Sequence, residues 1–316
     1  MATAGEHAQP TTGVGVELLD YGTRERWLGA RSMGVGASES AALFGVSPWE
    51  TVLSLWAKKT NRIEPDEIAG EWLEWGNLLE EPIAKRYESR TGRKVWQGGP
   101  YCVAQHPTIE CMRATPDRWV IEATDRTPDG LLQIKNTNAF KGHDWDDGPP
   151  NYIQIQVQHE MAVTGRSWAS VAVLIGGAEF RFFDVERNPA FIEELETQVR
   201  WFWGFVERDE RPPIDGSIRT LETLKKLHPK DSGEIVTLPD ESLDWWLEME
   251  RIRSTKSQAE KDETAVKAKL FAAFGDATYG VLPDGRRLSL KTSNRAGYTC
   301  EATTFRSLRL EKGPKK

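Results

Sequence analysis

An acidic residue and a lysine lie at a spacing that suits phosphodiester hydrolysis. Asp117 follows Pro116, and the triplet Gln133-Ile134-Lys135 begins sixteen residues after the acid, with apolar runs bordering both segments. An acid on one strand and a polar-x-lysine triplet on the next can gather a divalent cation and an ammonium group around one phosphate. In such a site the cation activates water, and the lysine supports the nucleophile or the developing charge. The pattern predicts a metal-dependent phosphodiesterase, although alone it is weakly specific.

The bulk composition sets limits on the kind of protein. A chain of 316 residues is long enough for a core of about 200 residues with an appendage. The hydrophobic fraction is 39%, and no apolar run approaches the roughly 18 residues that span a bilayer. A net charge of −7 argues against broad adhesion to nucleic acid but permits a local basic groove. Three cysteines without CxxC spacing favour neither a disulfide framework nor a zinc site, which fits a reducing cytoplasm.

The chain divides into four parts by composition. Residues 1–20 are predicted to be a disordered leader, because their polar start lacks a basic-then-apolar signal pattern. Residues 21–210 carry the periodic apolar patterns of a folded domain. The Pro-containing stretch 211–239 is predicted to be a linker, and 240–316 to hold a long helix, a β-hairpin and a solvated basic tail.

Within the folded part, the periodicity predicts both helices and strands. Ser38 is expected to cap a helix in the broken helical region 26–58. Residues 141–150, rich in Gly, Asp and Pro, are expected to form a loop. Further helices are predicted over 72–90, 152–163 and 189–206, and strands over 94–96, 100–103, 112–121, 131–136, 169–175 and 179–186.

The C-terminal part has its own pattern. Residues 240–274 contain no Gly or Pro, and their apolar residues recur at a 4-3 spacing that Lys256 and Glu263 interrupt. This spacing predicts a long helix with the character of an imperfect coiled coil. Val281-Leu282 and Leu288–Leu290 flank a Pro-Asp-Gly turn, which predicts the hairpin.

Four segments in order resemble a known family. They are Gly36–Glu39, Glu74–Pro82, Thr115–Asp117 with Leu132–Lys135, and Tyr152 with Gln156–His159. Over about residues 26–208 the chain resembles the YqaJ-type viral recombinases, relatives of the phage lambda exonuclease in the PD-(D/E)xK nuclease superfamily. Each motif is modest alone, but the four together at compatible spacing are specific.

The resemblance implies an α/β (α+β) fold with a central mixed sheet flanked by helices. It also implies Mg²⁺-dependent digestion of double-stranded DNA ends, with Mn²⁺ as a substitute, in the 5′-to-3′ direction. The product would be a 3′ overhang used in phage or prophage recombination in the cytoplasm of a bacterial host. Such relatives often form homotrimers beside a single-strand annealing protein, and no membrane association is implied.

The resemblance also assigns roles to residues. Glu80 occupies the position of a helix carboxylate, Asp117 that of the main metal ligand and Lys135 that of the catalytic lysine. The metal would be held by Glu80, Asp117, Gln133 and the backbone carbonyl of Ile134. Ordinary structural roles compete with each assignment: an exposed helix acid, a turn cap and an exposed strand lysine.

Three more residues complete the implied site. Gln156 matches a glutamine that orders the site, although it is also a plausible surface amide. Arg31 and Ser38 occupy positions that hold the 5′ phosphate of DNA, for which an arginine fork and a hydroxyl at a helix start are suitable. A solvated arginine and an N-cap serine are the structural alternatives.

Gln133 departs from the family pattern, which usually has glutamate there. A neutral amide offers one oxygen to Mg²⁺ but removes a charge, so metal affinity should fall unless Glu80 or Glu81 compensates. A DNA-end-binding protein with weakened catalysis is therefore one alternative function. A structure-specific or nicking endonuclease and a protein-interaction module built on 240–274 are two others.

Some residues resemble ligands without the right context. Asp144, Asp146 and Asp147 stand beside Gly148 in a predicted loop, where acids are usually solvated. His143 and His159 lack ligand spacing, and His159 is expected to pack or hydrogen-bond on its helix.

Overall fold

The structure is a computed structural model that describes residues 17–64, 70–121, 130–295, 297, 302 and 304–310. The chain forms two compact units, Met1–His228 and Pro229–Lys316, which are treated separately below. Most of the predicted leader, the basic tail, Cys300 and most of the predicted turn before Gly130 lie outside the described residues. Among the described helices, none is both long and apolar enough to cross a membrane.

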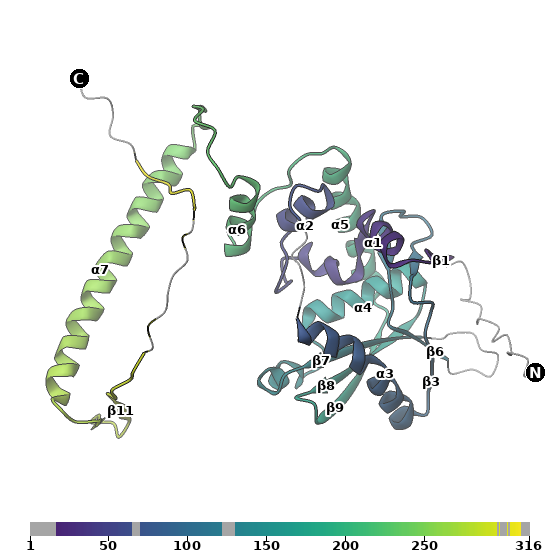
Figure 1. Ribbon diagram of the computed structural model, residues 1–316, viewed down its shortest axis with the longest axis horizontal. Coiled ribbons are helices and arrows are strands. Elements are labelled where there is room, and N and C mark those ends of the chain that lie inside the picture. Colours follow the sequence, from purple (N-terminus) through teal and green to yellow (C-terminus); the bar gives the residue numbers. More distant parts are fainter. Residues whose placement is uncertain are drawn as a thin grey trace, which may run out of the picture. The chain divides into compact units, whose positions relative to one another are not determined.

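The first unit is built on a five-stranded mixed sheet (Figure 1). Strands β7 and β8 are parallel, and the other neighbouring strands are antiparallel. This sheet confirms the predicted fold class. In spatial order its strands are β3 (Lys94–Trp96), β6 (Arg118–Ile121), β7 (Gly130–Thr137), β8 (Trp168–Ile175) and β9 (Glu179–Glu186).

Helices cover both faces of the sheet, because alternate strand residues point to opposite sides. Helix α3 (Glu71–Thr91) packs Ile83 and Tyr87 against Leu132 and Ile134 of β7. The other face belongs to the larger core, in which α4 (Asn151–Thr164) packs with α2 (Val52–Lys59) and α5 (Pro189–Glu207). As a result, Leu132 and Ile134 of β7 belong to the core under α3, whereas Leu131 belongs to the larger core that includes α4; Figure 1 shows the two helices and the sheet.

A break at Pro116 places Asp117 between two sheets. Residues 112–121, predicted to be one strand region, divide into β5 (Met112–Ala114) and β6 of the central sheet. Proline has no N–H to donate and disfavours a continuous ladder. Strand β5 belongs to a four-stranded sheet, which contains β1 (Glu17–Asp20), β4 (Cys102–Gln105), β5 and β2 (Val35–Gly36). Its strand β1 falls at the end of the predicted leader.

Ser38 is not a helix cap, contrary to the sequence prediction. The segment is a 3-10 helix, η1 (Ala37–Ala42), that follows α1 (Arg24–Ser32) and β2. Gly36 precedes it, and the Glu39 carboxylate accepts a hydrogen bond from the Gly36 N–H at 2.7 Å. Gly36 is therefore the N-cap, the Glu39 carboxylate satisfies its N–H, and Ser38 stays exposed on the first turn.

Two predicted loops contain short helices. Residues 141–150 overlap the 3-10 helix η2 (Ala139–Trp145), and the predicted linker 211–239 contains α6 (Ile218–Leu227). Ser217 caps α6, and Thr220 Oγ1 lies 3.2 Å from Thr51 Oγ1 at the start of α2. Helix α6 therefore packs on the first unit.

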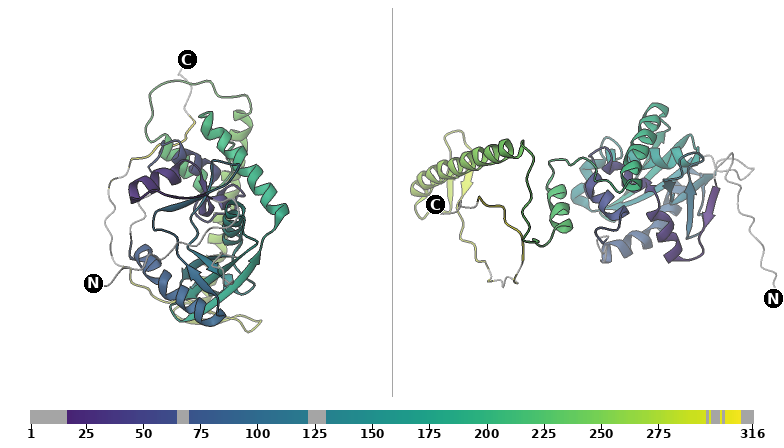
Figure 2. Two further views of the ribbon diagram at one scale, coloured as in Figure 1. Left: turned by 90° about the vertical axis from the view of Figure 1, so that its right-hand side faces the viewer. Right: turned by 90° about the horizontal axis from the view of Figure 1, so that it is seen from above.

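The second unit contains the predicted long helix and hairpin. Helix α7 (Ser242–Phe274) is continuous for 33 residues (Figure 2), and β10 (Tyr279–Val281) pairs with β11 (Arg287–Ser289). No described residue of α7 is buried. Several of its apolar side chains, including Trp245, Ile252 and Val266, are more than half exposed. The coiled-coil interpretation remains a prediction.

Candidate active site

Asp117 directly precedes β6 and contacts Gln133 and Ile134, the first two residues of the triplet. Asp117 Oδ2 accepts a hydrogen bond from Gln133 Nε2 at 2.6 Å and one from the Ile134 N–H at 2.7 Å. Arg118 pairs with Leu132, so Ile134 lies beyond the end of the β6 ladder and its N–H is free to bind the carboxylate. Asp117 Oδ1 accepts no hydrogen bond from the described residues, so one carboxylate oxygen is available.

The remaining groups of the triplet are oriented by strand geometry. In a strand, the N–H and C=O of one residue point to the same side, so the Ile134 carbonyl faces the side of Asp117. Gln133 and Lys135 are two residues apart and share one face of β7. Within the described part of the chain, Lys135 Nζ forms no hydrogen bond or ion pair, so its ammonium group is available to a substrate.

Glu80 approaches from α3 through a buried arginine. Arg118 is 3% exposed. Its Nη1 donates to the Asp117 carbonyl at 2.7 Å and lies 3.4 Å from Glu80 Oε2, while its Nη2 lies 3.3 Å from Glu81 Oε2. Glu81 is exposed and also bonds Lys85, whereas Glu80 is half-buried near Asp117. Of the two adjacent glutamates, Glu80 is therefore the one placed at the site.

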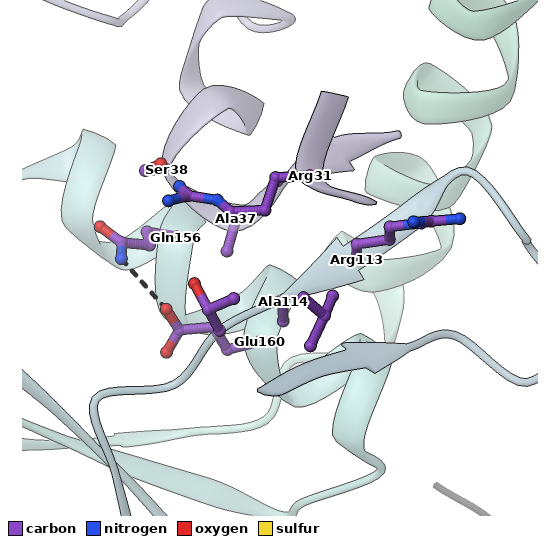
Figure 3. Close-up of a pocket in the computed structure, with 10 residues that line it drawn as sticks. Arg31, Ala37, Ser38, Arg113, Ala114, Gln156 and Glu160 are labelled. Atoms are coloured by element: carbon purple, nitrogen blue, oxygen red, sulfur yellow. Dashed lines mark hydrogen bonds between the residues drawn. The ribbon is translucent and has the colours of Figure 1, made fainter. Parts of the chain in front are cut away.

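Gln156 and Glu160 face the same region from one turn of α4. Gln156 Nε2 donates to Glu160 Oε1 at 3.0 Å (Figure 3). Glu160 is only 1% exposed, and its second oxygen, Oε2, has no hydrogen-bond partner. Gln133 Oε1 is likewise buried without a partner. These are the two buried side-chain oxygens without a partner among the described residues of the first unit.

The carboxyl groups of this region have raised pKa values. Burial raises the pKa of Asp117, an effect that the nearby Lys135 opposes. Burial and the charge of Asp117 raise the pKa of Glu80, and the same two causes raise the pKa of Glu160 to about 8. Raised carboxyl pKa values in a concave polar site are typical of functional sites. Burial is the main cause of each shift, and a bound cation would favour the charged form of these carboxyls.

A pocket adjoins these residues. Arg31 and Ser38 line it together with Gln156, Glu160 and Thr115, which is two residues before Asp117. Figure 3 shows the Arg31 side chain extending toward Ser38, whereas Arg113 points away. The Arg31 guanidinium stacks at 4.6 Å over the Trp27 ring and makes no hydrogen bond or ion pair with the described residues.

A buried histidine fixes the wall of this pocket. His159 is fully buried, and its Nδ1 lies 2.5 Å from Ser40 Oγ of η1. Its Nε2 lies 3.0 Å from the Arg113 carbonyl of β5. Because a carbonyl only accepts, Nε2–H is the donor and Nδ1 accepts from the serine. Burial lowers the pKa of His159 to about 3, so the ring is neutral. This confirms a hydrogen-bonding role for His159.

The donor set fits a divalent cation of the Mg²⁺ type. Hard cations take oxygen ligands, and Asp117 Oδ1, Gln133 Oε1 and the Ile134 carbonyl are oxygens without a described side-chain partner. No group of three or more His, Cys, Asp or Glu side chains in the described residues is arranged to hold a metal. A cation here would therefore need neutral oxygens beside its carboxylates.

Two acids of the predicted loop 141–150, Asp144 and Asp146, pair with basic side chains outside the candidate site. Asp146 pairs with Arg181 at 2.9 Å, and Asp144 lies 3.0 Å from His143 Nε2. Among described residues these side chains form no metal-holding group.

Sequence reasoning missed Glu160 and Arg118. Glu160 stands four residues after Gln156, the spacing at which helix residues share one face. That spacing was a usable signal, but a glutamate in a helix is normally exposed. Arg118 follows Asp117 directly, and its tie to Glu80 depends on the packing of α3.

Comparisons with known proteins identify the family of this chain. The mixed α/β fold brings Asp117, which directly precedes β6, beside the β7 triplet that ends in Lys135. A family model described as a YqaJ-like viral recombinase domain matches residues 26–167. The uncharacterized protein YqaJ of Bacillus subtilis (strain 168) is 30% identical over 270 residues, 82% of this chain and 81% of that protein. The chain belongs to the YqaJ-like viral recombinase family.

Two solved structures are also similar. An alkaline exonuclease from Laribacter hongkongensis is 26% identical, and the match covers 58% of this chain and 93% of that chain with a TM-score of 0.48. Its complex with dAMP is 27% identical, with 64% and 96% coverage and a TM-score of 0.49.

Proposed function

We propose that this protein is a metal-dependent exonuclease that degrades linear duplex DNA from its 5′ ends and leaves 3′ overhangs for recombination. One observation carries the proposal. The pocket of Arg31 and Ser38 is also lined by Gln156, Glu160 and Thr115, and Thr115 stands two residues before Asp117, which bonds Gln133. A site for a terminal phosphate and a site for hydrolysis would thus adjoin each other.

The residues have distinct roles in this proposal. Asp117, Gln133, Glu80 and the Ile134 carbonyl hold the cation, which is Mg²⁺ with Mn²⁺ as a substitute. When bound, such a cation neutralises phosphate charge and increases the acidity of water. Lys135 holds the attacking water and stabilises negative charge that develops on the phosphate.

The adjoining pocket determines where cutting starts. Arg31 offers a planar fork of donors with no other described ion partner, and Ser38 offers an exposed hydroxyl. A terminal 5′ phosphate carries more charge than an internal phosphodiester, so this pair favours chain ends. Gln156 ties the pocket to the hydrolytic site through its bond to Glu160.

The test is digestion of a linear duplex labelled at either strand end. The duplex carries a 5′ phosphate or a 5′ hydroxyl, and Mg²⁺ and Mn²⁺ are compared with EDTA. We expect metal-dependent nucleotide release from the phosphorylated 5′ end, and no cleavage of closed circular DNA. Release from neither end would contradict the proposal, and nicking of the circle would favour a structure-specific endonuclease.

A second function is favoured by the Gln133 amide. Its Nε2 hydrogen-bonds Asp117 Oδ2 at 2.6 Å, so it occupies one oxygen of the main metal ligand and brings no charge. A protein that holds DNA ends and cuts poorly would follow. In that case the wild-type protein would shift end-labelled DNA in a gel without shortening it, and Gln133→Glu would gain cleavage.

Oligomer and partners are further parts of the proposal that rest on the family resemblance. A homotrimer would enclose duplex DNA, and a single-strand annealing protein would receive the 3′ strand in the bacterial cytoplasm. The unpartnered apolar side chains of α7 are the proposed means of self-assembly or docking. An unchanged oligomer and unchanged partner binding after removal of α7 would contradict that role.

A further inference from the structure

We propose that Glu160 supplies the negative charge that Gln133 lacks, so that Asp117 and Glu160 together hold the divalent cation, with Gln133 Oε1 as a neutral ligand. The inference rests on the proposed nuclease function and adds a residue that the motif comparison does not assign. The family pattern has a carboxylate at the position of Gln133 on strand β7; in this chain the carboxylate would come from helix α4 instead.

The first step concerns what the strands provide. Gln133 is 3% exposed, and its amide is oriented by donation to Asp117 Oδ2. That orientation leaves its Oε1 buried and without a partner. The strand pair therefore supplies one carboxylate and one bare amide oxygen, which is a weak set for a hard dication.

The second step concerns the state of Glu160. Its Oε1 is held by Gln156 Nε2 at 3.0 Å, whereas Oε2 is buried and unpartnered. Burying a carboxyl oxygen without a partner is unfavourable. A protonated Oε2 would not remove the cost, because its O–H would then need an acceptor. A cation would satisfy the oxygen directly.

The third step is position. Glu160 lies near enough to Asp117 and Lys135 for both charges to act on it. Helix α4 packs on the same core face of the sheet as Leu131 and Val171, the face that also carries Gln133 and Lys135. Glu160, which Figure 3 shows bonded to Gln156 at the pocket, therefore lies on the helix that packs on the face of the sheet carrying the strand site.

Glu80 is less suited to the compensating role. Its Oε2 accepts from the buried Arg118 guanidinium, so part of its charge is already balanced. Glu160 has no arginine or lysine in an ion pair with it among the described residues.

The experiment measures Mn²⁺ binding to the full chain by calorimetry, in parallel with cleavage of linear duplex DNA. Glu160→Gln keeps the shape and an acceptor for Gln156 while removing the charge. We expect Mn²⁺ affinity to fall at least about tenfold, because even partners of metal ligands contribute about 10- to 100-fold. Gln133→Glu combined with Glu160→Gln should restore affinity, because the charge returns to the site on the strand.

The matched control is Glu194→Gln on α5. Gln198 Nε2 donates to Glu194 Oε1 at 2.8 Å, the same kind of i,i+4 pair, but on the exposed surface. This variant should bind Mn²⁺ and cut like the wild type. Circular dichroism of every variant checks that the fold persists.

The outcomes separate this inference from the proposed function. Wild-type Mn²⁺ affinity in Glu160→Gln, or no Mn²⁺ binding by the wild type, overturns the inference. If the double variant binds Mn²⁺ no more tightly than Glu160→Gln, a carboxylate on the strand cannot replace the one on the helix, and that part of the inference is overturned. A wild type that binds Mn²⁺ through Glu160 yet never cuts DNA supports the inference and contradicts only the nuclease function.

Discussion

Helices α4 and α7 use polar residues in opposite ways. Helix α4 has 14 residues, of which eleven are buried, including Gln156, Gln158, His159 and Glu160. Helix α7 has 33 residues, none of them buried, and displays apolar side chains at its surface. Buried polar groups require partners, and exposed apolar groups gain from acquiring them.

The buried polar residues of α4 show which of them are structural. Gln158 Nε2 donates to the Glu186 carbonyl at 2.7 Å, and its Oε1 accepts from the Asn188 N–H at 2.9 Å. Both nitrogens of His159 are also engaged. Among the buried side chains of α4, Glu160 is the one with a fully buried oxygen that has no partner. The buried polar oxygen that could take part in chemistry thus lies in the first unit, and the exposed apolar helix lies in the second.

The largest expected effect comes from the strand residues that face α4. Asp117→Ala and Lys135→Ala should each lower the initial rate of nucleotide release by about 10²- to 10⁴-fold, the usual range for a positioned catalytic group. Thermal unfolding should show a folded protein in both cases. Wild-type rates in either variant would place the chemistry elsewhere.

A smaller effect is expected at the pocket. Arg31→Ala should reduce the preference for a 5′ phosphate over a 5′ hydroxyl by about 10-fold, because a charge-assisted donor contributes about 1.5–3 kcal/mol. Arg31→Lys should retain only part of the preference, since an ammonium group lacks the planar fork. The ratio of release rates on the two substrates measures this, and an unchanged ratio in Arg31→Ala would exclude the pocket as the phosphate site.

The next effect is a dependence of the stability of the fold on pH. The pKa of Glu160 is raised to about 8 in the folded chain, so the folded state retains a proton that the unfolded state loses near pH 4.3. That stabilisation is complete below the unfolded pKa and is lost as pH rises toward 8. In EDTA, the melting temperature should therefore fall over this range less steeply for Glu160→Gln than for the wild type. Parallel curves would contradict the burial of an ionisable Glu160.

The smallest effect should come from removing the second unit. A chain ending at residue 228 should cut DNA at the wild-type rate, because all proposed site residues lie in the first unit. A chain ending at residue 210 is the sharper comparison. It also lacks α6 and the bond between Thr220 and Thr51, so its melting temperature should fall by several degrees. Loss of cutting at 228 would give α7 a direct part in the reaction.

Local patterns were sufficient for much of the fold. Helix α3 and strands β8 and β9 follow their apolar periods, and Gly92 ends α3 with a φ of 76°, a conformation that glycine adopts without strain. The spacing of Asp117 and Lys135 also predicted a shared site, and the structure places their strands side by side.

Other features depend on distant partners and could not be predicted locally. The N-cap of η1 is Gly36 rather than Ser38, and the Glu39 carboxylate three residues on reaches the Gly36 N–H. Helix α6 is short and is held by α2, so composition alone favoured a linker. A glutamate in a helix is usually exposed, and the burial of Glu160 becomes evident only once α4 is packed on the sheet.

The most direct test is to locate Mn²⁺ by its anomalous scattering in crystals of the wild-type protein. The account predicts a peak at ligand distance, about 2.0–2.6 Å, from Asp117 Oδ1 with Gln133 Oε1 beside it. A peak at Asp144, Asp146 and Asp147 instead, or none near Asp117 at saturating Mn²⁺, would contradict the assignment of this site.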